Sequence, residues 1–416
     1  MPPVGVVLRG SWAPWALPVV AIFIAVYAAD SPPVDDRYWV SATAAGVLLM
    51  IFVAPACAVC AAWDGFRSRR LERAVGIPVR SPIRLMLNVC WPVGLLGLAA
   101  LGLSLWLYLP PGGTPGGPEP RIVGVFILLL AAHTAVGYVV GRLLPVVMAV
   151  PLVAIGSYLL GAMPPAMEPV WLRHIVGTGL DTCCWLDEVP DPAALWAPVL
   201  FYGAALVAVV GFALLRPAWR IVAVLPLAVS GVVAVRLVAP MDWTPTQPRP
   251  MADASCYDAE PELCIWPEQH RVADDVRVWA AEPLERLDAA GLEYPPELDP
   301  LSFDVTGLDP DRVRATVAAH LMPSVVCENG VTDVFFDTED RVAGWLHLTV
   351  GVSDAGVESV IPVDALRQSR AVHEHMAPPE QLNWYRSELD VLSACGFADP
   401  AQAADQAAVN TPERDE

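Results

Sequence analysis

Length, composition and charge together exclude an ordinary soluble protein. The chain has 416 residues, of which 55% are hydrophobic and 17% charged, and its mean hydropathy is +0.48, which is more apolar than soluble domains are. Residues 1–240 carry 14 arginines and 11 acids, whereas residues 241–416 carry 11 arginines and 34 acids, so their net charges are +3 and −23. Two physically different regions therefore meet near Pro240.

The first region contains seven apolar segments near the ~20 residues that a helix needs to cross a bilayer. They are residues 12–29, 39–62, 86–109, 121–141, 143–163, 196–215 and 219–239. Stretches such as IVGVFILLLAA lack the polar face of a helix in a soluble core, so we expect a transmembrane helical domain over residues 1–240. The first segment also resembles a cleavable signal, because Arg9 precedes it and small residues follow it.

Orientation follows from arginine, because the chain contains no lysine. Six arginines lie between the second and third segments, and others fall in the remaining even-numbered turns. They are Arg67, Arg69, Arg70, Arg73, Arg80 and Arg84, and then Arg142, Arg216 and Arg220. The opposite loops carry mostly acids. The positive-inside rule therefore predicts a cytoplasmic amino terminus in the cell membrane, and seven crossings place everything after Pro240 outside.

Six of the nine cysteines fall on this outer side, where disulfides can form. They are Cys183, Cys184, Cys256, Cys264, Cys327 and Cys395. Six cysteines allow 15 pairings, so the partners stay open, although we expect adjacent Cys183 and Cys184 each to pair elsewhere. Zinc binding is a weaker alternative, because the spacings match no familiar four-ligand pattern.

Residues 241–398 read as an extracytoplasmic α+β domain, and the polar segment 399–416 as a disordered tail. We expect a helix from Pro267 to about Ala290 and further helices at 309–321, 364–376 and 379–396. Strands are expected at 301–306, 331–337 and 344–352, the last two as a hairpin. The predicted fold class is thus a mainly α membrane protein with about seven transmembrane helices and a C-terminal α+β soluble domain.

Motifs for catalysis are missing, so we do not expect an enzyme. Without lysine there is no GxxxxGK phosphate loop and no Schiff base to pyridoxal phosphate, and neither HExxH nor GxSxG occurs. His373 and His375 are two apart on an expected helix and point away from one another, so they predict a solvated face rather than a metal site. We expect no cofactor, and the acidic second region should repel nucleic acid.

His133 is the ionisable residue deep within a predicted segment, and such residues are the default functional candidates in membranes. It either lines a path or hydrogen-bonds a neighbouring helix. Gly137 with Gly141, and Ser157 with Gly161, offer faces for close helix packing. Buried carboxylates for a proton-coupled or sodium-coupled carrier are not evident.

The basic amino-terminal stretch LRGSWAPW, the arginine-rich loop after the second segment and the long outer loop before the sixth resemble permease subunits of export-type ABC transporters. The resemblance implies that residues 67–73, with Arg67, Arg69, Arg70 and Arg73, dock on a separately encoded ATPase. It also implies that residues 170–175 dip toward the bilayer. The chain is similar as well to uncharacterised permease-like membrane proteins of high-GC Gram-positive bacteria. A seventh helix and a large outer domain depart from the exporter pattern.

Three functions remain open at this point. The preferred one is a permease-like subunit that works with such an ATPase in the export of, or resistance to, an amphipathic compound, as a homo- or hetero-oligomer. The alternative is a non-transporting, membrane-anchored protein whose outer domain binds a peptide, an envelope component or a partner protein. The third is an envelope enzyme.

Overall fold

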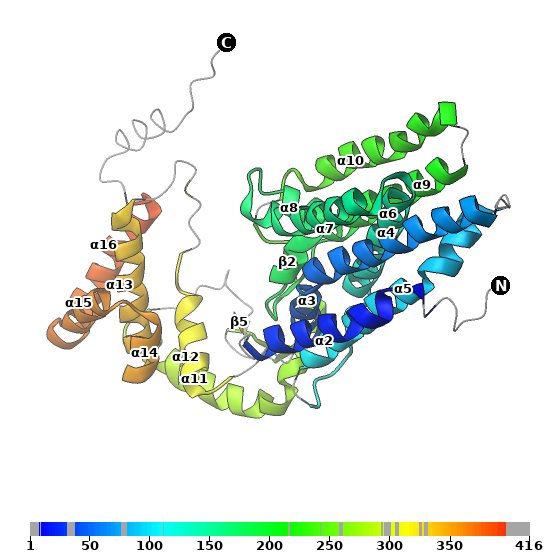
Figure 1. The fold of residues 1–416 in the computed structure, drawn as a ribbon. Helices are drawn as coiled ribbons and strands as arrows, with labels where there is room; N and C mark the ends of the chain where they lie inside the picture. The colour runs from blue at the N-terminus through cyan, green and yellow to red at the C-terminus, as the bar shows by residue number, and fades with distance from the viewer. Residues whose placement is uncertain are drawn as a thin grey trace, which may run out of the picture. The chain divides into compact units, whose positions relative to one another are not determined.

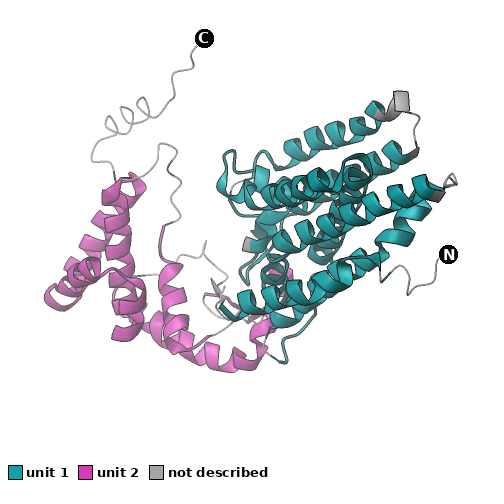
Figure 2. Cartoon of the chain, in the orientation of Figure 1, with its two compact units in different colours: residues 1–249 teal, residues 250–416 magenta. Residues whose placement is uncertain are grey.

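The computed structural model describes residues 8, 10–30, 38–75, 81–110, 112–214, 217–241, 243–257, 261–292, 294, 301–303, 308–323, 327 and 332–396. This part of the chain is mostly helical, with a few short strands (Figure 1). It forms two compact units, Met1–Arg249 and Pro250–Glu416 (Figure 2). The tail expected at 399–416 lies outside the described residues, as do Arg9, Arg80 and Arg216.

Six helical stretches of the first unit, within the described residues, are long and apolar enough to span a membrane. They are α2 (Ala13–Asp30), α4 (Met50–Val75), α5 (Pro82–Leu107), α6 (Pro120–Leu143), α9 (Pro192–Leu214) and the stretch Ile221–Val238, which joins the end of η3 (Pro217–Val224) to α10 (Leu225–Val238). The remaining expected segment is α7 (Val146–Ala162), whose 17 residues span about 25 Å. This length is at the lower limit for a crossing.

The segment expected as one helix over residues 39–62 is divided in the structure. Helix α3 (Trp39–Val47) ends at a turn at Leu48 and Leu49, and α4 then runs for 26 residues to Val75. The arginine-rich residues 67–73 are therefore the last turns of a long helix and not a loop, as the sequence had suggested.

The apolar helices of the first unit run alternately between two ends. At one end, here called the arginine end, the rings of Trp12 and Trp63 lie 5.4 Å apart and Arg69 donates to the Leu143 carbonyl at 2.9 Å. At the other, the cap end, the Tyr38 hydroxyl donates to the Glu188 carbonyl at 2.8 Å. Helix α2 begins at the arginine end, because Ser11 bonds Asp64 there. The last helix, α10, ends at the cap end, where Val238 packs in one cluster with Ile175.

Small residues set the closest helix contact of this unit, between α4 and α6. A Cβ atom added to Gly137 would clash with the Ala58 carbonyl, and one added to Gly141 with the Ala62 carbonyl. Ala58 faces Gly137 and Ala62 faces Gly141, so the residue numbers rise in the same direction along both helices and the two helices run parallel. Backbones approach this closely only where side chains are absent, so Gly137 and Gly141 form the helix-packing face that the sequence indicated.

A folded connection closes the cap end between α7 and α9. It consists of η1 (Pro164–Ala166), α8 (Leu172–Val176), η2 (Thr178–Thr182) and β1 (Glu188–Pro190). Strand β1 pairs antiparallel with β2 (Thr246–Pro248), with Val189 opposite Gln247. This pairing places residues 246–248, which follow α10, in the first unit.

The second unit is a small helical domain with one short sheet. Its helical elements are η4 (Met251–Asp253), η5 (Pro267–Val272), α11 (Ala273–Ala289), α12 (Pro310–Ala319), α13 (Asp333–Val350), α14 (Asp354–Val360), α15 (Val363–His375) and α16 (Pro378–Ser393). Strands β3 (Ser255–Tyr257) and β4 (Leu263–Ile265) pair antiparallel, and β4 pairs in parallel with β5 (Leu301–Ser302). Helix α12 begins as its sequence predicts, with Asp309 as the N-cap that accepts from the Arg312 amide and Pro310 in the first turn.

The strands expected at 331–337 and 344–352 are wrong. Residues 333–350 form one helix, α13. Its buried positions include Thr338, Val342, Trp345 and Thr349, which recur at the spacing of four, three and four that one helix face requires. The valines and aromatic residues favoured strands locally, but burial of this single face against the core decided the structure.

Large side chains fill the core of the second unit. Trp266 and Trp345 are each only 1% exposed and Phe303 is fully buried. The Trp345 indole donates to Gln381 at 3.0 Å, and the Tyr385 hydroxyl donates to the Leu321 carbonyl at 3.1 Å. The polar groups of Trp345 and Tyr385 are thus satisfied within this core.

Candidate functional site

The interior of the first unit contains a small polar cavity near the cap end. It has a volume of about 20 Å³, enough for one water molecule. Its polar lining consists of His133, Ser157, Thr178, Asp181 and Tyr202. These side chains come from α6, α7, η2 and α9, and apolar residues of α3 and α4 complete the wall of the cavity.

His133 is positioned by two neighbouring helices. Its Nδ1 lies 3.0 Å from Ser157 Oγ on α7, and its ring centroid lies 5.7 Å from that of Tyr202 on α9. The Tyr202 hydroxyl donates to the Val176 carbonyl at 3.1 Å. His133 thus both bonds a neighbouring helix and lines the cavity.

The connection between α7 and α9 brings Thr178 and Asp181 to this cavity. Gly177 joins α8 to η2 with a φ of +78°, and a Cβ added there would lie 3.3 Å from Pro198. Glycine suits this left-handed, closely packed turn. Thr178 is 7% exposed, and its hydroxyl has no hydrogen-bond partner among the described residues. A hydroxyl buried in this way is costly unless a ligand or water satisfies it.

The residues expected to dock an ATPase lie at the arginine end, and they differ from one another. Arg69 donates to the Leu143 carbonyl at the end of α6, and Arg67 is partly buried. Arg70 and Arg73 are exposed on the last turns of α4. Two of the four arginines are therefore held in the fold, and two are free to meet a partner.

Two polar contacts of the arginine end were not anticipated. Arg142 forms a two-pronged ion pair with Glu72, with N–O distances of 2.7 and 2.9 Å. Asp64 is 2% exposed and accepts from Ser11 at 2.8 Å, which links the residue two positions before α2 to α4. The sequence did not predict this contact, because Asp64 lies two residues beyond the expected span 39–62 and the continuation of α4 to Val75 was not expected.

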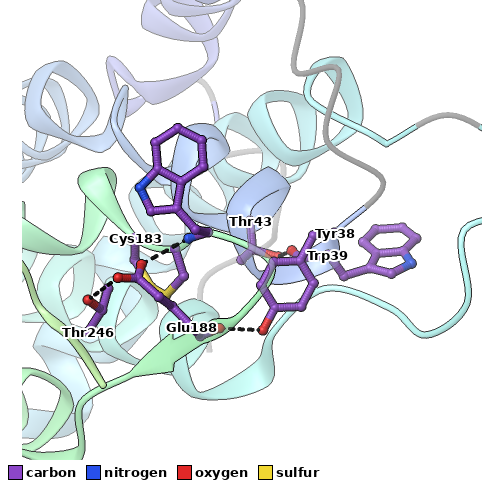
Figure 3. The surroundings of a disulfide bond; sticks show 8 residues. Tyr38, Trp39, Thr43, Cys183, Glu188 and Thr246 are labelled. Carbon is purple, nitrogen blue, oxygen red and sulfur yellow. Dashed lines mark hydrogen bonds between the residues drawn. A yellow bond between two sulfur atoms is a disulfide. The ribbon is translucent and has the colours of Figure 1, made fainter. Parts of the chain in front are cut away.

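The six cysteines expected on the outer side form three pairs. Cys256 and Cys264 face one another across β3 and β4, and Cys327 pairs with Cys395 at a Cα distance of 5.9 Å. Cys183 and Cys184 form a disulfide with each other (Figure 3), and the peptide bond between them is cis, contrary to the expectation that each pairs elsewhere. The other four of these six cysteines pair with one another within the second unit.

The vicinal pair belongs to the hydrogen-bonded cap drawn in Figure 3. Glu188 accepts from the Trp185 amide and from the Thr246 hydroxyl, each at 3.0 Å, and its carbonyl accepts from Tyr38. The cap therefore ties together three segments far apart in the sequence, near α3, β1 and β2.

One group of side chains has the spacing of a metal site. Ligand atoms of Cys256, Glu262 and Cys264 lie within 4.8 Å of one another. Because the two sulfur atoms form a disulfide, no thiolate remains for a metal. The group therefore does not fit a metal ion.

Comparison with known proteins adds one finding. Residues 263–395 match a domain of unknown function, DUF7224. The match covers about a third of the chain, from β4 to Cys395, and so corresponds to the core of the second unit. No curated protein and no solved structure matches the chain.

Proposed function

We propose that the chain is a permease-like membrane subunit that works with a separately encoded ATPase in the export of, or resistance to, an amphipathic compound. One observation carries the proposal. Helix α4 extends past its apolar part and presents Arg70 and Arg73, both exposed, at the arginine end. A rigid cationic helix end is a suitable surface for a cytoplasmic partner.

We further propose that the arginine end is cytoplasmic and that the second unit is outside the cell. The positive-inside rule favours this orientation. The alternating course of the apolar helices supports an odd number of crossings, with α7 as the shortest. The two cysteine pairs of the second unit require an oxidising compartment.

The alternative function is capture of a peptide, envelope component or partner protein by the second unit. It is favoured by a separate observation. The second unit has its own hydrophobic core and two internal disulfides, and the family match is confined to it. A domain with its own core can carry a function without transport by the membrane unit.

Purification from the native membrane in mild detergent tests the docking proposal. We expect an ATPase to remain attached to the wild-type chain. The double change Arg70→Ala and Arg73→Ala should reduce its recovery at least about tenfold, because two exposed charges at an interface are removed. Arg367→Ala is the control, since that side chain is 73% exposed in the second unit.

Two results would contradict docking: an ATPase that is never recovered with the wild type, or one recovered equally with the double variant. In the first case, binding of envelope material by the second unit becomes the leading function.

Orientation has its own test with a thiol reagent that cannot enter intact cells. Ser359→Cys, at an exposed position of α14, should be labelled, whereas Arg73→Cys should react only after the cells are broken. The native free cysteines Cys57, Cys60 and Cys90 are buried and give little background. The reverse labelling pattern would overturn the proposed topology.

A further inference from the structure

The first unit has a groove lined by residues of α5, α6 and α9. Its apolar part has a volume of about 430 Å³ and is lined by Met86, Gly94, Leu98, Ile127, Ala135 and Leu206, among others. This volume falls in the range of sites for organic ligands.

A second cavity, of about 310 Å³, continues this groove to the arginine end. The two cavities share Met86 in their linings. Their other lining residues follow within about one helical turn, from Ala135 to Tyr138 on α6 and from Leu206 to Val209 on α9. The groove therefore has one apolar end and one end beside Arg69 and Arg142.

The two arginines at this end differ in whether an acidic side chain compensates their positive charge. Arg142 is neutralised by its ion pair with Glu72. Arg69 donates one N–H to the uncharged Leu143 carbonyl and has no acidic partner among the residues that the structure describes. Its remaining N–H groups and its full charge are available, and a guanidinium binds phosphate through paired hydrogen bonds.

The length of the groove matches one leaflet of a bilayer. Met86 and Leu98 are twelve positions apart on α5, which is about 18 Å, and half of the hydrocarbon layer is about 15 Å. An acyl chain that starts at the headgroup level beside Arg69 would thus reach the middle of the membrane.

We propose that this groove binds one anionic phospholipid of the surrounding bilayer, with its phosphate at Arg69 and an acyl chain between α5, α6 and α9. The apolar wall accounts for the chain and the unpaired guanidinium for the charge. A zwitterionic lipid carries a compensating cation and gains less from Arg69. The site is independent of ATPase docking, which was assigned to Arg70 and Arg73.

The full chain in mild detergent, analysed by native mass spectrometry, tests the site. Phosphatidylglycerol should be retained about fivefold better than phosphatidylcholine, which is the size of effect expected from one cation at a headgroup. Arg69→Gln should abolish this preference. Its control is Arg84→Gln, because Arg84 is exposed on α5 and lines neither cavity.

A second variant fills the groove without touching an arginine. A Cβ at Gly94 meets nothing within 4 Å, so Gly94→Phe should lower retention of both lipids. Gly102→Phe is the control, because Gly102 is on the same helix, is equally open and lies outside the groove lining. This pair tests the acyl-chain part of the site even if Arg69→Gln fails to fold, and the comparison of the two lipids on the wild type tests the preference for an anionic headgroup.

Three outcomes would overturn the proposal: equal retention of the two lipids by the wild type, unchanged retention in Gly94→Phe, or binding of inorganic phosphate alone with the same loss in Arg69→Gln. The last would indicate a soluble anion as the ligand instead of a lipid.

Discussion

The two units of this chain differ in the side chains that lie at their closest packed contacts. In the first, glycine and alanine lie at the α4–α6 contact, while large residues such as Trp106 and Val147 are 64% and 80% exposed. In the second, Trp266, Trp345 and Phe303 are at the centre. A helix in lipid gains nothing from hiding an apolar side chain and associates by close packing, whereas a domain in water is held together by burial. The difference indicates which solvent each unit meets.

The largest expected effect comes from filling the α4–α6 contact. Gly141→Leu forces a side chain into the backbone of α4 at Ala62 and should destabilise the first unit by at least about 3 kcal/mol. The measurement is the yield of monodisperse protein in detergent and its thermal unfolding. Gly124→Leu is the matched control on α6, because a Cβ there meets nothing within 4 Å. Equal losses in both variants would show that packing at Gly141 is not special.

A comparable effect is expected from the disulfides of the second unit, and it should depend on loop length. Cys327 and Cys395 are separated by 68 positions and Cys256 and Cys264 by 8. In the chain-entropy description their removal costs about 4 and about 2.5 kcal/mol, respectively. Replacing each pair with serines and measuring unfolding in denaturant compares the two. A larger loss for the short loop would mean that native contacts, not loop closure, dominate.

The smallest expected effect is a pH dependence of the second unit at His347. Burial lowers the pKa of His347, and a hydrogen bond with the Ala315 backbone acts in the opposite direction. The folded state therefore favours neutral imidazole, so this contribution to stability is complete above the ordinary pKa of about 6.5. It declines as the pH falls below that value toward the folded pKa, because the unfolded chain then binds the proton more readily.

Thermal unfolding at pH 7.5 and 5.5 measures this difference. We expect His347→Gln to unfold with a smaller difference between the two pH values than the wild type. His375→Gln is the control, in the last turn of α15 and exposed. An unchanged pH difference in His347→Gln would place the dependence on other groups.

Hydropathy predicted the long apolar helices, of which six among the described residues could span a membrane, but it did not show the division between α3 and α4. The close helix contact at Gly137 and Gly141 could also be predicted, because two glycines four positions apart lie on the same face of a helix. The error at 331–352 arose where strand-favouring valines and aromatics lay on one helix face, so that the spacing of Val342, Trp345 and Thr349 was the better signal. The polar cavity could not be predicted, because Ser157, Thr178, Asp181 and Tyr202 come together only through the turn at Gly177.

The backbone contact between α4 and α6 also restricts how the membrane unit can change shape. At Gly137 and Gly141 the two helices touch through backbone atoms, and the ion pair between Arg142 and Glu72 joins the same two helices. Sliding one helix past the other would break both contacts. In any conformational change of the first unit, α4 and α6 must therefore move together as one rigid body, and only the helices around them can rearrange.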